Sequence, residues 1–140
     1  MAVIAILLAL WLGEIGERNR YELSEVTVHD GDTITARINL GWRISIKEHI
    51  RAADYDAWEI TKTRRTVEVT DDEIAKGKTA KSFVETFAGD NNHQLFIVGI
   101  LRGEGRDVYG RILGEIWCRE KNGEWTNLGD LMREKGHVRK

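Results

Sequence analysis

The chain has 140 residues, the length of one domain, and its 41% hydrophobic and 31% charged residues suffice for a buried core and a soluble surface. The net charge of -2 excludes a protein that coats nucleic acid through bulk positive charge, but it leaves room for a local basic site. A single cysteine, Cys118, excludes an internal disulfide framework and a zinc site made of several thiolates.

The first segment is an unbroken apolar run over residues 2–12, followed by a polar linker. The run is shorter than the roughly 20 residues that span a bilayer, and it has the length of a signal-peptide core. No Lys or Arg precedes it, and no clear small-x-small cleavage site follows it. An uncleaved anchor, a weak export signal and a mis-set start codon remain open, with export or membrane tethering slightly favoured. We divide the chain into a leader with linker, residues 1–20, and one domain, residues 21–140.

Three strands are predicted between residues 21 and 56. Apolar and polar residues alternate over residues 25–28 and again over residues 33–40, with the turn pair Asp30-Gly31 between them. After Gly41 the alternation resumes with Ile44 and Ile46 on one face. These patterns predict a three-stranded antiparallel meander.

The next segment, residues 61–70, is polar and partly basic, and it is predicted to be a mobile surface loop. A helix follows, because Thr70 and Glu73 have the spacing of a capping box. Its expected end is Gly89. The residues expected on its buried face recur at helical spacing and are Ala80, Phe83, Val84 and Phe87.

The last third of the chain predicts two more strands, within residues 93–103 and 109–120, then a hairpin turn at Asn122-Gly123. A short helix follows over residues 127–136, capped by Asn127. The order of three strands, a helix, two strands and a helix predicts an α+β, mainly β, fold. The expected architecture is a five-stranded OB-fold Greek-key barrel with a helix after strand three and a short C-terminal helix.

Four carboxylates near predicted strand ends are candidates for chemistry: Asp30, Asp32, Asp56 and Glu59. In an antiparallel meander the start of strand two lies beside the end of strand three, so Asp32 and Asp56 are expected to converge. Two converging carboxylates repel each other unless a cation lies between them. Oxygen ligands without His or Cys indicate Ca²⁺ or Mg²⁺. The alternative is that Asp30 and Asp32 are ordinary turn residues.

Two arginines fit the same chemistry. Arg51 precedes Asp56 by five residues, and Arg111 follows the Tyr109-Gly110 pair. An isolated arginine usually forms a surface salt bridge or faces solvent. A pair beside a metal suits phosphoryl transfer, because arginine donates bidentately to phosphate and stays charged.

Three sequence blocks resemble the staphylococcal nuclease (thermonuclease) family in order and spacing: DGDT at residues 30–33, RAADYDAWE at 51–59 and DVYGR at 107–111. The following helix segment and the pattern N-L-x2-L-x4-G at residues 127–136 also match, so the resemblance covers about residues 24–138. It implies a Ca²⁺-dependent nuclease on an OB barrel. The implied substrate is DNA or RNA, cleaved to a 5′-hydroxyl and a 3′-phosphate.

The resemblance also implies a role for each matching position. The implied metal ligands are Asp32, Asp56 and the backbone carbonyl of Ala57. Asp30 resembles the neighbouring acid that supports the metal's water shell. The implied catalytic residues are the general base Glu59 and the phosphate clamp Arg51 and Arg111. Tyr109 resembles an aromatic residue near a terminal phosphate.

Further substrate contacts are expected next to Glu59. Lys62, Arg64 and Arg65 can hold backbone phosphate, although a solvated loop explains them equally well. Trp58 stands where the family has proline, which loosens that turn, and it is expected to stack on a base or to pack on the loop. The four histidines share no spacing and are expected at surface or strand positions.

Two rival interpretations remain open. One is a catalytically inactive OB-fold module that binds nucleic acid or protein, and the other is a membrane-anchored structural domain, which depends on residues 2–12 alone. The residues that favour the nuclease are Asp32, Arg51, Asp56, Glu59 and Arg111, because a binding module needs no general base beside a metal and two arginines. No obligate protein partner is expected.

Overall fold

The structure, a computed structural model, describes residues 20–64, 67–90, 95–99 and 105–139. The predicted leader and linker lie outside these ranges except for Arg20, which begins the first strand. Neither helix in the described ranges combines the length and the apolar composition needed to cross a membrane.

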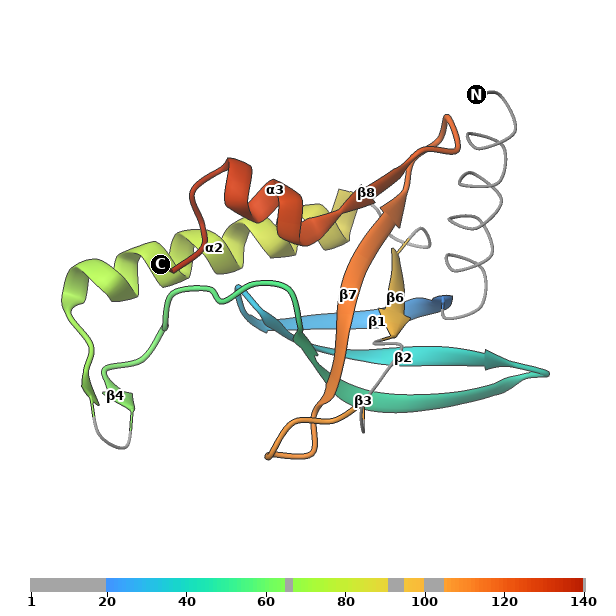
Figure 1. Cartoon of the computed structure of the whole chain (residues 1–140), viewed down its shortest axis with the longest axis horizontal. Coiled ribbons are helices and arrows are strands. Elements are labelled where there is room, and N and C mark those ends of the chain that lie inside the picture. Colours follow the sequence, from blue (N-terminus) through green and yellow to red (C-terminus); the bar gives the residue numbers. More distant parts are fainter. Residues whose placement is uncertain (1–19, 65–66, 91–94, 100–104, 140) are drawn as a thin grey trace, which may run out of the picture.

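Five strands form a closed barrel (Figure 1). The predicted meander is confirmed as β1 (Arg20–Asp30), β2 (Thr33–Gly41) and β3 (Ile44–Ala52), paired antiparallel in that order. β6 (Leu95–Gly99) pairs antiparallel with β1, and β7 (Ile112–Arg119) pairs antiparallel with β6. A parallel pairing of β3 with β7 closes the ring. The fold is therefore mainly β and consistent with an OB-like barrel.

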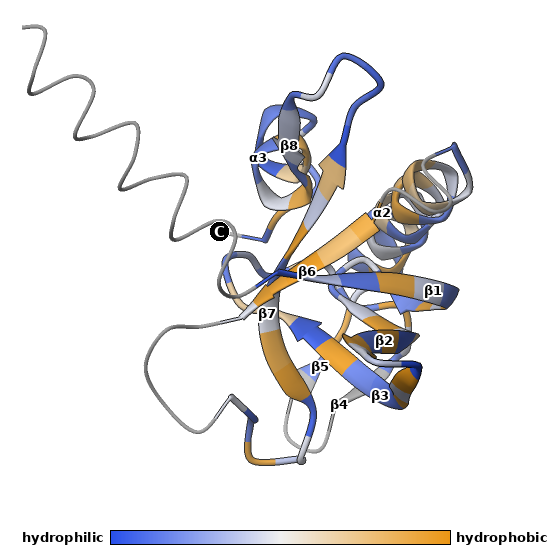
Figure 2. Ribbon diagram, turned by 90° about the vertical axis from the view of Figure 1, so that its right-hand side faces the viewer, coloured by the Kyte–Doolittle hydropathy of each residue, from blue (hydrophilic) through white to orange (hydrophobic). Residues whose placement is uncertain are grey.

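The barrel interior is filled by alternate residues of these strands, and β6 is hydrophobic along its length (Figure 2). The buried strand residues include Leu23, Ile34, Ala36, Ile38, Ile50, Leu95, Ile97, Ile116 and Cys118. Because successive side chains point to opposite faces of a strand, Thr33 and Thr35 of β2 and His49 and Arg51 of β3 face outward. The polar face that carries the candidate site is thus set by the same alternation that builds the core.

The helix α2 (Asp71–Asp90) contacts β1 and begins at the predicted capping box. The Thr70 N–H donates to Glu73 Oε2 (3.0 Å), and the Glu73 N–H donates to Thr70 Oγ1 (3.2 Å). The buried residues of its inner face include the predicted Ala80, Val84 and Phe87. The prediction that Gly89 ends the helix is wrong, because helical backbone continues through it to Asp90.

The segment before α2 also differs from the prediction. Residues 61–70 contain a small antiparallel hairpin, β4 (Thr63–Arg64) and β5 (Val67–Glu68), where a loop was expected. The polar composition of the segment obscured its β-branched residues, which favour extended backbone.

The chain after β7 follows the prediction closely. The Asn122-Gly123 turn leads into β8 (Trp125–Asn127), which pairs with β7. The helix α3 (Leu128–Glu134) begins at the predicted cap, where the Asn127 side chain accepts the Asp130 N–H at 3.1 Å. Gly136 has a φ of 75° just after the helix, in the left-handed region typical of a helix end.

The turn between β2 and β3 has unusual backbone. Gly41 pairs with Ile44, so Trp42 and Arg43 form a two-residue loop, and their φ angles are 50° and 63°. Hairpins of this kind need positive φ at both central positions, which Asn and Gly supply easily. Here two large side chains adopt that conformation. In Figure 1 this hairpin projects beyond the rest of the barrel.

Candidate active site

The turn between β1 and β2 supplies the first carboxylates of the site. The backbone N–H of Asp32 donates to Asp30 Oδ1 at 3.0 Å, which brings two acidic side chains to one turn. Gly31 between them is buried, and a Cβ at this position would lie 2.6 Å from the Cβ of Ala57 and 3.0 Å from that of Ala80. The glycine is therefore required for the close approach of this turn to the 57 segment and α2.

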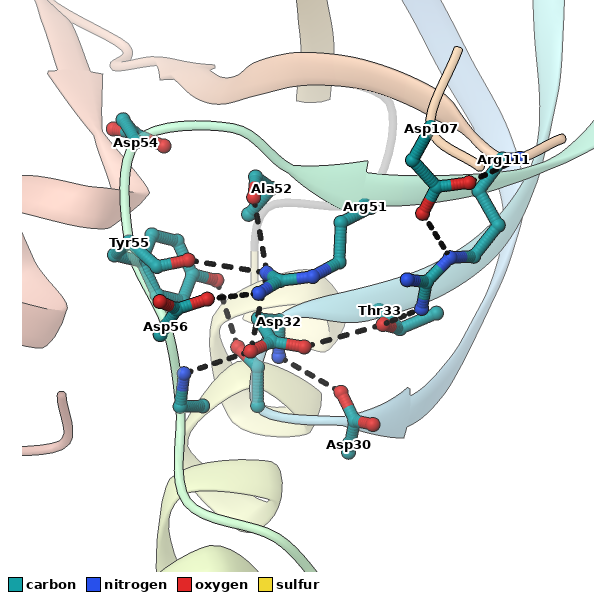
Figure 3. A network of polar contacts seen from close by, with 12 residues as sticks. Asp30, Asp32, Thr33, Arg51, Ala52, Asp54, Tyr55, Asp56, Asp107 and Arg111 are labelled. Carbon is teal, nitrogen blue, oxygen red and sulfur yellow. Dashed lines mark hydrogen bonds and ion pairs between the residues drawn. The ribbon is translucent and has the colours of Figure 1, made fainter. Parts of the chain in front are cut away.

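Asp32 is the most perturbed carboxylate of the site (Figure 3). Its Oδ2 accepts the Ala57 N–H at 2.7 Å, and its Oδ1 accepts the Thr33 hydroxyl at 3.2 Å. Burial, followed by the neighbouring Asp30 carboxylate, raises the pKa of Asp32 to about 7. The Ala57 N–H and the Arg51 guanidinium lower the pKa but do not offset the burial. A bound cation would stabilise the ionised form of this buried acid, which lies beside a second acid.

Arg51, at the end of β3, lies between the two predicted metal ligands (Figure 3). Its Nη1 is 3.1 Å from Asp32 Oδ2, and its Nη2 contacts Asp56 Oδ1. Nη1 also donates to the backbone carbonyls of Ala52 (3.0 Å) and Tyr55 (3.1 Å). The two carboxylates therefore converge, and the positive charge between them is the guanidinium.

Arg111 reaches the same face from the residue before β7. Asp107 holds it by accepting the Arg111 backbone N–H (2.9 Å) and Nε–H (2.6 Å). Arg111 Nη1 donates to the hydroxyl of Thr33 at 3.3 Å. The register pairs Thr33 with Arg51, so Arg111 contacts the strand neighbour of Arg51. The Tyr109 side chain is exposed, and the Arg111 guanidinium lies 5.4 Å from its ring centroid.

Glu59 is positioned by contact with α2. A Cβ at Gly77 would lie 2.1 Å from the Glu59 carbonyl oxygen and 2.8 Å from that of Trp58, so the helix approaches this segment backbone to backbone. The Trp58 ring carries the Lys76 ammonium of α2 at 4.8 Å from its centroid. Trp58 therefore contacts α2 through this cation–π interaction.

The donor set suits a hard divalent cation in chemistry. Asp32 and Asp56 supply carboxylate oxygens, which Ca²⁺ prefers, and Asp30 adds negative charge nearby. Two features stand against a preformed site. Arg51 is paired with both ligands, and the described ranges contain no cluster of three or more His, Cys, Asp or Glu side chains able to hold a metal. A cation at Asp32 and Asp56 would therefore replace an existing guanidinium contact.

Lys62, Arg64 and Arg65 are the basic residues expected to contact substrate after Glu59. Lys62 Nζ pairs with Asp71 Oδ1 at 3.0 Å, at the start of α2, in an exposed position. Arg64 lies in β4, and Arg65 lies outside the described residues. The contact of Lys62 is thus with an acid of the chain itself.

A cavity of about 410 Å³ borders the site and is shared by the 51–56 segment, Asp107 and Leu113. Arg51 and Asp56 line it, so an anionic group entering the cavity would meet the Arg51 guanidinium.

Sequence reasoning missed several residues of this site. Tyr55 is buried, and its hydroxyl donates to the Gly31 carbonyl at 2.7 Å, tying the carboxylate turn to the 51–57 segment. Burial raises the pKa of this phenol, so it stays a donor. Thr33 and Asp107 lie inside the quoted sequence blocks, but the pattern carried no signal for their bonds to Arg111.

The histidine prediction also missed a contact. His29 and His49 lie on strands β1 and β3, as surface positions, yet the register brings them to one hydroxyl. Thr35 Oγ1 is 2.5 Å from His29 Nε2 and 2.9 Å from His49 Nδ1. Strand pairing, which linear spacing does not reveal, produces this cluster.

No protein-family model matches the chain, and no curated protein matches it.

Proposed function

We propose that the chain is a Ca²⁺-dependent nuclease of the staphylococcal nuclease type that hydrolyses phosphodiester bonds of DNA or RNA. The proposed scaffold is an OB-fold Greek-key barrel with α2 inserted after β3 and α3 at its end. The observation that carries the proposal is that Arg111 contacts Thr33, the strand neighbour of Arg51, while Arg51 itself contacts Asp32 and Asp56.

The proposed mechanism gives each group one task. Arg51 and Arg111 hold the non-bridging oxygens of the scissile phosphate and stabilise the negative charge that builds up during attack. Both guanidiniums are preorganised, Arg51 by two backbone carbonyls and Arg111 by Asp107. Glu59 accepts the proton of the attacking water. Water forms the new P–O bond, the bond to the 5′-oxygen breaks, and that oxygen takes a proton from solvent, leaving a 5′-hydroxyl and a 3′-phosphate.

Asp32, Asp56 and the Ala57 carbonyl are the proposed metal ligands, with Asp30 near them. When bound, Ca²⁺ would add positive charge beside the phosphate. Arg51 has two proposed roles: it pairs with the carboxylates, and it holds the phosphate of the substrate. Binding of a cation would free its guanidinium from Asp32 and Asp56 for the substrate.

Proposed substrate contacts lie around the clamp. Tyr109 is exposed beside Arg111 and can stack on a base or approach a terminal phosphate. Lys62, Arg64 and Arg65 are the proposed partners of backbone phosphates farther along the strand, and Trp58 completes this set. Their contribution is to affinity, not to bond cleavage.

A specific observation also favours the alternative, a catalytically inactive OB-fold module that binds nucleic acid or protein. The pairing of Arg51 with both carboxylates neutralises them without a metal. A chain in which this pairing persists would bind a polyanion on its outer face and would not cleave it.

Cleavage of single-stranded DNA and RNA by the full chain separates the two functions. The assay is run with Ca²⁺, with Mg²⁺ and with chelator, and DNA binding is measured in parallel. Glu59→Gln tests the base, and Glu85→Gln on the exposed side of α2 is the matched control. Calcium-dependent cleavage that is lost only in Glu59→Gln supports the nuclease. Binding without cleavage under either metal ion would assign the chain to the alternative.

A further inference from the structure

The β2–β3 turn carries an apolar cluster that no part of the proposed site uses. Leu40, Trp42 and Ile44 are exposed to 45%, 96% and 55%, and they fall within five consecutive residues. Single exposed apolar residues are common, but a cluster of this kind at the end of a projecting hairpin marks an interaction surface. We call Leu40, Trp42, Arg43 and Ile44 the hairpin tip.

The backbone of the hairpin tip supports a role for these side chains. Trp42 and Arg43 both have positive φ, a conformation that bulky residues rarely adopt. Asn-Gly would form the same turn without strain. Strain of this kind persists where the side chains themselves serve a purpose.

The charge of the hairpin tip is distinct from that of the whole chain. Residues 38–47 contain Arg43 and Lys47 and no acidic residue, although the net charge of the chain is -2. An indole flanked by aliphatic residues and cations has the composition of a membrane-interface anchor, in which Trp lies at headgroup level and cations attract acidic lipids.

The position of the hairpin tip fits this composition. β1 runs antiparallel to β2, with Leu23 opposite Ile38, so the chain enters the domain from residue 19 at the end of the sheet where the tip lies. Figure 1 shows β1 beginning on that side of the barrel. Arg20, the first described residue, and the hairpin tip therefore lie at the same end of the sheet. A single weak signal is only marginally sufficient for stable attachment to a bilayer, and the apolar run at positions 2–12 of the sequence is a second one.

We propose that the hairpin tip docks on the surface of a lipid bilayer that contains anionic headgroups. The proposed site is at the opposite end of the same hairpin, where β2 begins at Thr33 and β3 ends at Ala52. The nine residues of β2 span eight steps of about 3.3 Å, so the two ends of the hairpin are roughly 26 Å apart. A tip on the membrane thus holds Arg51 and Asp32 away from the lipid and open to the aqueous phase. This docking is independent of the proposed nuclease activity.

Vesicle binding of the full chain tests the proposal. Large vesicles of phosphatidylcholine, with and without phosphatidylserine, are prepared with brominated acyl chains that quench nearby indoles. All proteins carry Trp11→Phe, so that the leader contributes no signal. We expect quenching that disappears when Trp42→Phe is added. We also expect about tenfold weaker partitioning for Trp42→Ser with Ile44→Ser. Arg43→Gln with Lys47→Gln should remove the preference for phosphatidylserine.

Val108→Ser is the matched control, because Val108 is 93% exposed but lies outside the hairpin tip. It should bind vesicles as the parent does, and thermal unfolding of every variant checks that it is folded. Unchanged partitioning of the tip variant, or absence of Trp42 quenching, would overturn the proposal. So would quenching of Trp42 by a single-stranded oligonucleotide but not by vesicles. A dimer in sedimentation that Trp42→Ser dissociates would instead assign the tip to a second copy of the chain.

Discussion

Gly77 of α2 lies directly against the backbone of Glu59, and a Cβ at position 77 would fall 2.1 Å from the Glu59 carbonyl oxygen. A backbone atom cannot yield as a flexible side chain does, so Gly77→Ala must displace either the helix or the Glu59 segment. We expect it to lower the free energy of unfolding by about 1–3 kcal/mol. Cleavage activity should fall further than this loss of stability explains.

The matched control for this substitution is Gly89→Ala in the same helix, where no atom lies within 4 Å of the added Cβ. It should raise the free energy of unfolding by about 0.5–1 kcal/mol and leave activity unchanged. Urea unfolding and cleavage assays on both variants make the comparison. Similar effects of the two substitutions would refute a positioning role for Gly77.

The Asp32 carboxyl predicts a pH-dependent difference in stability. Its pKa is about 7 in the folded chain and 3.8 in the reference state. Between pH 3.8 and about pH 7 the folded chain binds a proton that the unfolded chain has released. The contribution of Asp32 to the free energy of unfolding therefore falls as pH rises. Asp32→Asn removes that contribution. The variant should gain roughly 2–4 kcal/mol relative to the wild type between about pH 4 and pH 7.

Urea unfolding of both proteins at intervals across this range measures the difference. Parallel curves for the wild type and Asp32→Asn would show that Asp32 ionises normally. Added Ca²⁺ should flatten the wild-type curve if Asp32 is a ligand, because a metal binds the ionised carboxylate and releases its proton.

Asp107 is a positioning residue for Arg111, since it accepts both the backbone N–H and the Nε–H of that arginine. Asp107→Asn keeps an acceptor oxygen but removes the charge that holds the guanidinium. We expect kcat for DNA cleavage to fall by about tenfold or more, with little change in Ca²⁺ affinity. Val108→Ser in the same loop changes a side chain that is 93% exposed and should alter neither quantity. An equal loss in both variants would indicate a general effect of the loop.

The strained turn predicts a stabilised variant. Replacing Trp42-Arg43 by Asn-Gly supplies the residues that adopt positive φ readily, and it should raise the free energy of unfolding by about 1–3 kcal/mol. The same variant should bind vesicles more weakly than the wild type. Gly123→Ala, at φ 87° in the other hairpin, should destabilise the chain by about 1 kcal/mol. Denaturant unfolding measures both variants. If both substitutions raised the free energy of unfolding, or both lowered it, this reasoning would be wrong.

The helices and strands that could be predicted are those whose sequence signals lie within a few consecutive residues. The alternation around Ile34 and Ile50 and the capping box at Thr70 and Glu73 each depend on residues a few positions apart. The parallel pairing of β3 with β7 has no such signal, because it joins distant segments through backbone hydrogen bonds alone. The β4–β5 hairpin was missed because its strands are only two residues long.

The candidate site was predictable to a similar degree. The order of the sequence blocks predicted that Asp32, Arg51 and Arg111 lie on one part of the barrel. It could not show which carboxylates the guanidiniums contact. That choice depends on side-chain conformation and burial. The Tyr55 hydroxyl bond to Gly31 likewise joins two segments by geometry that only the folded chain provides.

The parallel pairing that closes the barrel also fixes when the arginine pair can exist. Arg51 is on β3, and Arg111 immediately precedes β7, so the two meet only after residues 50–52 have joined residues 112–114. Contacts between distant segments pay their loop-closure entropy first and tend to form slowly. A nascent chain whose β7 is still within the ribosome has only one of the two arginines in place. For the proposed nuclease, such a delay would leave the growing chain without a complete phosphate clamp until β7 has paired with β3.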